Sequence, residues 1–110
     1  SLRSLTEEEL VRLLTEPKNA LVRQYTKLMA LSGVRLIVEE GALKAMAAEA
    51  ERRGTGARAL RSIFENLMMD VMYDVPSQGN VESVTITKDV VEGKGKPIMK
   101  VSKEKKRKHA

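Results

Sequence analysis

Hydrophobic residues recur at helical spacing in four segments of the chain. In each segment apolar side chains return every three or four residues, which places them on one face of an α-helix. The sequence therefore predicts four amphipathic helices. Their apolar positions are Leu10, Leu13 and Leu14; Leu21, Tyr25, Leu28 and Met29; Leu43, Met46, Ala47 and Ala50; and Leu60, Ile63, Phe64, Leu67, Met68, Val71 and Met72.

Residues that favour helix ends mark where these helices begin and end. Thr6 is followed three residues later by Glu9, the spacing of a capping box, which predicts the start of the first helix. The second helix is expected to end at Ser32-Gly33, the third at Gly54, and the fourth before Pro76.

The boundary between the first two helices allows more than one interpretation. Thr15-Glu16-Pro17 is typical of a second helix start, because proline in a first turn gives up an amide that has no partner there. The pattern fits two helices that meet at Pro17, or one long helix kinked there. Residues 16–19 also fit a functional loop, although ordinary N-terminal helix residues explain them equally well.

Three short segments have the alternation that is typical of strands. Apolar residues alternate over 34–38 and again over 84–86, and 98–101 has a third short apolar run. Gly93 and Pro97 help to break the chain between the last two segments. The order of elements predicts an α+β domain in which a small three-stranded sheet lies against a layer of about four helices.

Length and charge favour one folded domain followed by a basic tail. A chain of 110 residues suits one domain, which we expect over 1–101, with 102–110 as a polar and mobile tail. Residues 100–108 contain six basic side chains and one acidic one, which accounts for the whole net charge of +5. The remaining chain is neutral overall, which argues against a nucleic-acid interface on the globular part. A module whose basic tail grips phosphates is the competing hypothesis.

Missing residue types exclude several kinds of chemistry. The chain has no cysteine and its single histidine is His109, which argues against thiolate zinc sites, histidine metal sites and Ser-His-Asp catalysis. No apolar run reaches the roughly 20 residues that span a bilayer. The chain begins Ser-Leu-Arg-Ser, with neither a methionine nor a signal peptide, and we expect it to be a piece of a longer protein.

The segment Gly54-Thr55-Gly56-Ala57-Arg58 is the most informative candidate for function. It lies between the third and fourth helices and places Arg58 in the first turn of the fourth. Because a helix N-terminus favours negative groups, an arginine there beside free amides suits an anion such as a phosphate. Gly56 and Ala57 would let a nucleotide approach the backbone closely. A plain connecting loop with a solvated arginine is the alternative interpretation.

Other patterns favour structural roles. Gly93-Lys94-Gly95-Lys96 lacks the spacing and the Lys-Ser/Thr ending of a phosphate-binding loop, so we expect a turn between strands. Asp70 and Asp74 lie four residues apart and are expected on a solvated helix face. Three methionines of the fourth helix are expected to fill the core: Met68, Met69 and Met72.

Three motifs taken together resemble one known family. They are Glu-Pro-Lys-Asn-Ala-Leu at 16–21, Thr-Gly-Ala-Arg with Leu-Arg-Ser at 55–62, and Met-Tyr-Asp-Val-Pro-Ser at 72–77. The chain resembles the C-terminal small domain of ClpX-type AAA+ unfoldases, in unbroken order from the first helix to about Val101. Gly-Ala-Arg alone would fit HslU or the second modules of ClpA and ClpB as well, so the lid of one of these unfoldases is the alternative.

The resemblance implies a nucleotide-sensing role for Arg58. In this family the arginine of Gly-Ala-Arg is the second sensor, which reaches the phosphates of ATP, and Gly56 and Ala57 would form its supporting turn. The phosphate loop and the acids that bind Mg²⁺ belong to a large domain that this sequence lacks. We therefore expect no catalytic residue and no metal ligand in this chain, and no ATP hydrolysis by it alone.

The resemblance also implies partners and a cellular location. Such a lid joins its own large AAA+ domain through a hinge and packs against the neighbouring subunit of a homohexamer. The ring delivers unfolding substrates to the ClpP peptidase through regions that lie outside this chain. The family implies the bacterial cytoplasm, or alternatively the mitochondrial matrix or a plastid, and it implies neither a membrane nor a nucleic acid as partner.

Two positions depart from the pattern of the family around the sensor. Gly54 replaces the usual lysine, which removes a positive charge near the nucleotide cleft. Ala59 replaces the usual glycine, which should stiffen the start of the fourth helix. The lysine-rich tail has no counterpart in the shared pattern.

Overall fold

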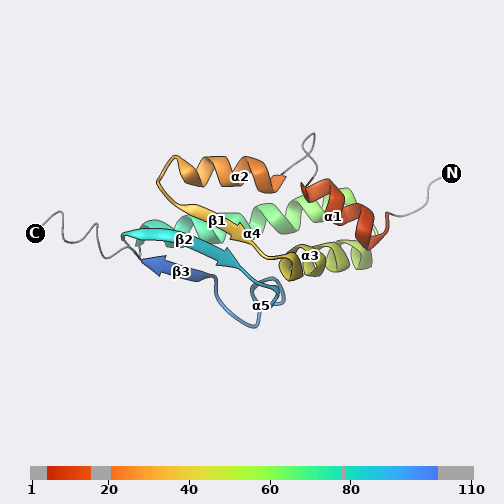
Figure 1. Ribbon diagram of the computed structural model, residues 1–110. Helices are drawn as coiled ribbons and strands as arrows, with labels where there is room; N and C mark the ends of the chain where they lie inside the picture. The colour runs from red at the N-terminus through yellow and green to blue at the C-terminus, as the bar shows by residue number, and fades with distance from the viewer. Residues whose placement is uncertain (1–4, 16–20, 78, 102–110) are drawn as a thin grey trace, which may run out of the picture.

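A computed structural model describes residues 5–15, 21–77 and 79–101. The junction at Pro17 and the basic tail lie outside the described residues. The predicted α+β class and three-stranded sheet are confirmed (Figure 1). In chain order the elements are α1 (Glu7–Thr15), α2 (Leu21–Ala30), β1 (Arg35–Val38), α3 (Glu40–Arg53), α4 (Ala57–Ser77), β2 (Val81–Ile86), α5 (Lys88–Val91) and β3 (Ile98–Val101).

The sheet has strand order β1-β2-β3 and is mixed. β1 and β2 are parallel, with Leu36 opposite Val84, whereas β2 and β3 are antiparallel, with Val84 opposite Met99. Parallel neighbours need a long crossover connection. Here α3 and α4 form that connection, so the turn between these two helices lies within the crossover.

The long helix α4 connects the two ends of the molecule. It extends from α1 and α3 at one end to the sheet at the other (Figure 1). Its 21 residues span about 30 Å at 1.5 Å per residue. Three helices, α1, α2 and α3, pack against it, and none of the described helices is long and apolar enough to cross a membrane.

The core lies where the apolar stripes of the helices meet. Phe64 on α4 is completely buried, and its ring meets that of Tyr25 on α2 edge to face, with centroids 5.3 Å apart and planes at 82°. This is a favoured geometry for aromatic pairs. Several other core side chains are also fully buried: Leu10, Leu14, Met46, Met68 and Val71.

The predicted start of α1 is confirmed in atomic detail. The backbone amide of Glu9 donates to Thr6 Oγ1 at 3.2 Å, and the amide of Thr6 donates to Glu9 Oε1 at 2.9 Å. These reciprocal bonds are those of a capping box, and they satisfy amides that the first helical turn leaves without partners.

The predicted end of α4 was wrong. The helix continues through Pro76 to Ser77. Proline is unfavourable inside a helix because it lacks an amide and crowds the preceding turn. In the last turn of a helix, a proline removes only one backbone hydrogen bond. Val75, the residue before Pro76, is buried in the core. Packing of the helix therefore outweighs the local preference of proline.

The structure also corrects two other predictions. Met68 fills the core, but Met69 and Met72 are 68% and 37% exposed, so they do not. A fifth helix, α5, follows β2, where no helix was predicted. Thr87 caps it by accepting a bond from the amide of Val90. A helix of four residues is too short to show a periodic pattern. Thr87 was the one local signal, because threonine favours the position just before a helix.

Phe64→Ala should strongly destabilise the domain, because it leaves a cavity in the centre of the core. We expect the free energy of unfolding to fall by about 3–5 kcal/mol, measured by urea denaturation. Leu31→Ala removes an apolar side chain that is 84% exposed, and it should change the same quantity by no more than about 0.5 kcal/mol. Equal effects of the two substitutions would contradict the assignment of the core.

Candidate functional site

Two glycines shape the turn between α3 and α4. Gly54 has φ of 80°, and its amide donates to the carbonyl oxygen of Glu51 at 3.1 Å, which ends α3. Gly56 has φ of 53°, and its carbonyl oxygen accepts from the amide of Leu60 at 3.0 Å, at the start of α4. Left-handed backbone is costly for residues with a Cβ atom, so glycine suits both positions.

This turn places Arg58 in the first turn of α4, as the sequence predicts. Ala57 is the first residue of the helix, and the amide of Arg58 donates to the carbonyl oxygen of Thr55 at 3.2 Å. The Arg58 side chain is exposed to solvent, whereas Gly56, two residues earlier in the chain, is half-buried. The start of α4 therefore presents a guanidinium group at the surface.

Arg58 borders a hollow between α1, α2 and the start of α4. Its volume is about 480 Å³. The leucines that line it include Leu21 and Leu60, which are nearly buried. Among the described residues, two arginines and no carboxylate line the hollow, and this lining suits an anionic ligand with an apolar part. The lining residues are Leu13, Leu21, Gln24, Ala57, Arg58, Leu60 and Arg61.

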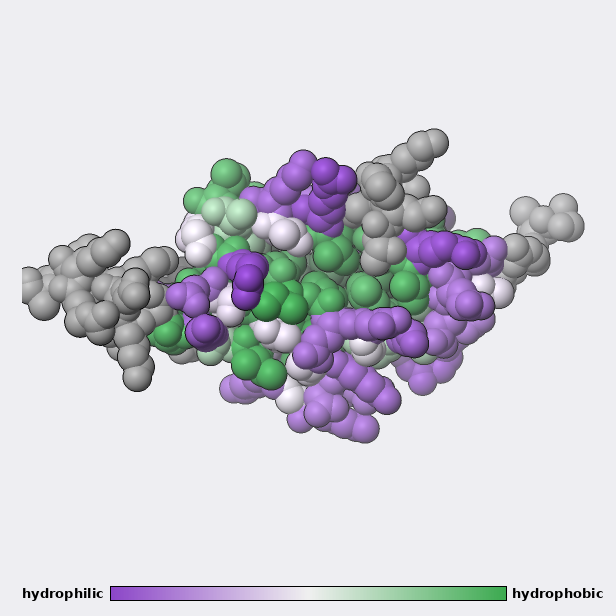
Figure 2. All heavy atoms as spheres, in the orientation of Figure 1, coloured by the Kyte–Doolittle hydropathy of each residue, from purple (hydrophilic) through white to green (hydrophobic). Residues whose placement is uncertain are grey.

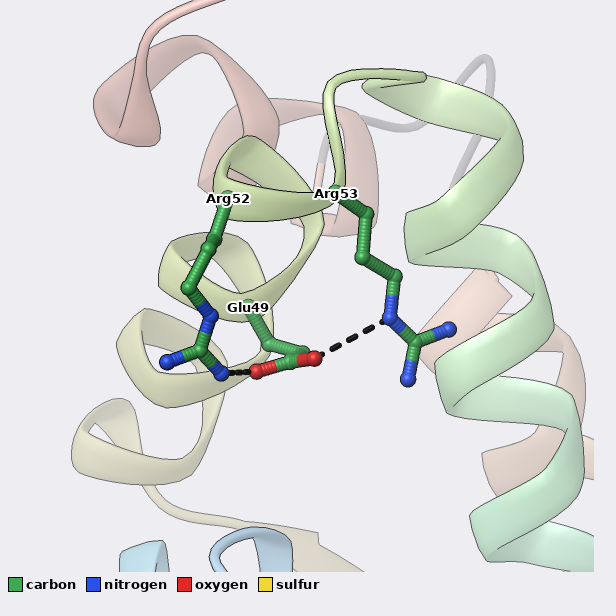
Figure 3. Close-up of polar contacts among 3 residues, drawn as sticks. All are labelled: Glu49, Arg52 and Arg53. Carbon is green, nitrogen blue, oxygen red and sulfur yellow. Dashed lines mark hydrogen bonds and ion pairs between the residues drawn. The ribbon is translucent and has the colours of Figure 1, made fainter.

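The other arginines beside the turn are engaged elsewhere. Arg53 Nε donates to Glu49 Oε2 at 3.0 Å, and Arg52 forms an ion pair with the other oxygen of Glu49 (Figure 3). Arg52 and Arg53 line a separate hollow together with Glu49 and Glu92. Lys94 lines it too, so two carboxylates offset two of its three positive charges, which makes this second hollow a weaker site for an anion than the hollow beside Arg58.

Sequence reasoning missed five residues that line the hollow beside Arg58: Leu13, Leu21, Gln24, Leu60 and Arg61. Arg61 follows Arg58 by three residues, which places both on one face of α4, and this spacing was a signal that could have identified it. Leu13 and Gln24 come from α1 and α2. Only the packing of those helices against α4 brings them to the site, so no local pattern identifies them.

The acidic residues show no metal site. Asp70 and Asp74 are both exposed on α4, in agreement with the predicted solvated face. Among the described residues, no group of three acidic or histidine side chains is placed to hold a metal ion. The Gly-Lys-Gly-Lys segment at 93–96 forms a turn and coil between α5 and β3, as expected.

A second surface feature lies at the opposite end of α4. Large apolar side chains are exposed near the C-terminal ends of α2 and α4, and we call them the apolar surface. Figure 2 shows hydrophobic atoms at that end of α2. Its members are Leu31 at 84% exposure, Tyr73 at 82%, Met69 at 68%, Leu28 at 44% and Met72 at 37%. Leu28, Leu31 and Met72 line one hollow together, and exposed apolar residues that lie together are typical of interaction sites.

Comparison with known proteins agrees with this geometry. Residues 5–88 match the family described as the C-terminal, D2-small domain, of ClpB protein. The chain belongs to this family of AAA+ small domains. It is also 47% identical, over 93 residues, to the ATP-dependent Clp protease ATP-binding subunit ClpX 3 of Methylococcus capsulatus. Together the two matches indicate that this chain is the C-terminal small domain of a ClpX-type AAA+ protein.

The match to ClpX 3 involves most of this chain but a minor part of the relative. It covers 84% of the chain and 21% of ClpX 3. The ATP-dependent activity named for that relative therefore belongs to a protein several times longer.

The backbone on either side of the turn suits the residues at positions 54 and 59. The left-handed conformation of Gly54 ends α3, and a residue with a Cβ atom would be strained there. Ala59 is buried within the start of α4, where alanine favours the helix.

Gly54→Ala should destabilise the isolated domain, because the backbone needs a positive φ that a Cβ atom disfavours. We expect the free energy of unfolding to fall by about 1 kcal/mol, measured by urea denaturation. Gly54→Asn should cost less, because asparagine tolerates this conformation better than alanine. If alanine is tolerated as well as asparagine, the left-handed end of α3 is not maintained in solution.

Proposed function

We propose that this domain is the ATP-sensing lid of a ClpX-type protein unfoldase, and that Arg58 contacts the phosphates of the bound nucleotide. The position of Arg58 carries the proposal: it lies in the first turn of α4, beside a hollow whose described lining contains two arginines and no carboxylate. Membership of the AAA+ small-domain family supports it. The nucleotide would occupy the cleft between this lid and the large domain of the same subunit.

Electrostatics explains how such a lid distinguishes two nucleotides. A guanidinium group near the terminal phosphate attracts ATP more strongly than ADP, since ATP carries an additional negative phosphate. Hydrolysis and release of that phosphate weaken the contact that holds the lid. The angle between the two domains then shifts toward another preferred orientation, because the ligand no longer favours the first one.

The described residues suit phosphate binding, but they do not supply all the groups that ATP hydrolysis needs. The hollow offers positive charge and an apolar wall, whereas the described residues offer no cluster of metal ligands. Mg²⁺ and the phosphate loop would come from the large domain. The chain alone would therefore not hydrolyse ATP, and the complete subunit would be an ATPase that unfolds proteins.

The apolar surface supports a role in ring assembly. Its exposed side chains would be covered by the large domain of a neighbouring subunit in a homohexamer, which would make the lid a joint of the ring. Motion driven at one nucleotide site would then pass to the next subunit. The ring would pull substrates through its pore and deliver them to the ClpP peptidase, most simply in a bacterial cytoplasm.

Arg58→Ala in the complete subunit should leave folding intact and sharply reduce nucleotide-coupled unfolding of substrates. Loss of a charge-assisted phosphate contact is worth about 1.5–3 kcal/mol, which corresponds to roughly one to two decades in an affinity or a rate. The measurement is the rate at which a fluorescent protein substrate loses its signal in the presence of ATP.

Lys44→Ala is the matched control for Arg58→Ala. It removes a cation from an exposed position on α3, where Lys44 pairs only weakly with Glu40 at 3.7 Å, and it should keep the wild-type rate. Wild-type unfolding by Arg58→Ala would refute the sensor role.

Leu31→Asp should weaken ring assembly without unfolding the domain, because it places a charge in a surface that a neighbour must cover. We expect sedimentation of the complete subunit with ATP to show fewer hexamers, while the melting temperature of the isolated domain stays within about 2 °C. Lys27→Asp changes a polar position on α2, four residues before Leu31, and this variant should form more hexamers than Leu31→Asp does. An unchanged hexamer population for Leu31→Asp would exclude this surface from the joint.

A further inference from the structure

A second arginine faces the hollow beside Arg58. Arg61 follows Arg58 by three residues on α4 and lines the same hollow. On a helix, residues three apart are neighbours on one face, with Cβ atoms about 5–6 Å from each other. Both guanidinium groups can therefore reach one extended anionic ligand that occupies the hollow.

Among the described residues that line the hollow, the charged side chains are Arg58 and Arg61. The partner of Arg61 is Glu65, one turn further along α4, and Arg61 Nε lies 3.3 Å from Glu65 Oε2. Glu65 does not line the hollow. The ion pair uses the Nε edge of the guanidinium group, whereas the two terminal nitrogens carry four further N–H donors. The pair thus orients Arg61 without placing a carboxylate at the site.

We propose that Arg61 is a second phosphate-binding residue of the nucleotide site and contacts phosphates that ATP and ADP share. The inference rests on the proposed function, in which Arg58 contacts the terminal phosphate of ATP. A residue one helical turn away would reach the neighbouring part of the phosphate chain. Arg61 would then contribute to the affinity for both nucleotides, whereas Arg58 would distinguish one from the other.

A purely structural role for Arg61 predicts a different behaviour. In that case its ion pair with Glu65 would brace α4, and removing either partner would have the same effect. Arg61 and Glu65 are 62% and 40% exposed, and exposed ion pairs contribute little to stability. Glu65→Gln breaks the same pair while it keeps the arginine, and it is therefore the matched control.

The test is nucleotide binding by the complete subunit, including its large domain. Titrations with fluorescent ATP and ADP analogues give the two dissociation constants, and circular dichroism gives the melting temperature. Arg61→Ala should raise both dissociation constants about tenfold. Arg61→Lys, which keeps the charge but loses the planar fork, should lie between wild type and Arg61→Ala. Glu65→Gln should leave both constants within about twofold of wild type.

The outcomes separate this inference from the proposed function. If Arg61→Ala leaves both dissociation constants unchanged, or if Glu65→Gln weakens binding as much, Arg61 is not a phosphate ligand. Arg58→Ala serves as the reference and should weaken ATP binding more than ADP binding. If Arg58→Ala keeps the preference for ATP while Arg61→Ala weakens both nucleotides, the sensor role fails but the phosphate contact of Arg61 stands.

Discussion

Burial of the apolar stripe of α4 is the interaction on which the rest of the structure depends. Phe64, Met68 and Val71 are completely buried along this stripe, and α1, α2 and α3 pack around it. The hydrophobic effect drives this burial, and the edge-to-face contact of Phe64 with Tyr25 adds a preferred geometry. Because the stripe continues to Val75, it also holds the last turn of α4 in helical form despite Pro76.

The same packing determines what the two ends of α4 can do. At its start, two glycines with positive φ reverse the chain and place Arg58 beside a hollow that α1 and α2 help to form. At its end, Met69, Met72 and Tyr73 remain exposed, and Met72 lines a hollow together with Leu28 and Leu31 at the end of α2. One rigid helix of about 30 Å therefore links a positively charged hollow to an apolar surface. This arrangement suits a domain that couples a ligand to a partner.

Much of the fold was predictable because its signals are local. Helical spacing located four helices, alternation located two strands and a short apolar run the third, and Thr6 with Glu9 located the start of α1. The candidate site was predictable only in part. Gly54, Gly56 and Arg58 lie together in one turn that their own backbone preferences define. Arg61 shares the helix face of Arg58, but its place in the hollow depends on the other elements.

The amino-acid sequence by itself determined the α+β class, the glycine turn and the position of Arg58 in the first turn of α4. These features follow from backbone preferences and from periodicity, which act between residues close along the chain. Only the tertiary structure decided that Leu13 and Gln24 join Arg58 at the hollow, that Met69 and Met72 are exposed, and that α4 continues through Pro76. These outcomes depend on which helix faces meet, because packing between distant segments outweighs local preference wherever the two conflict.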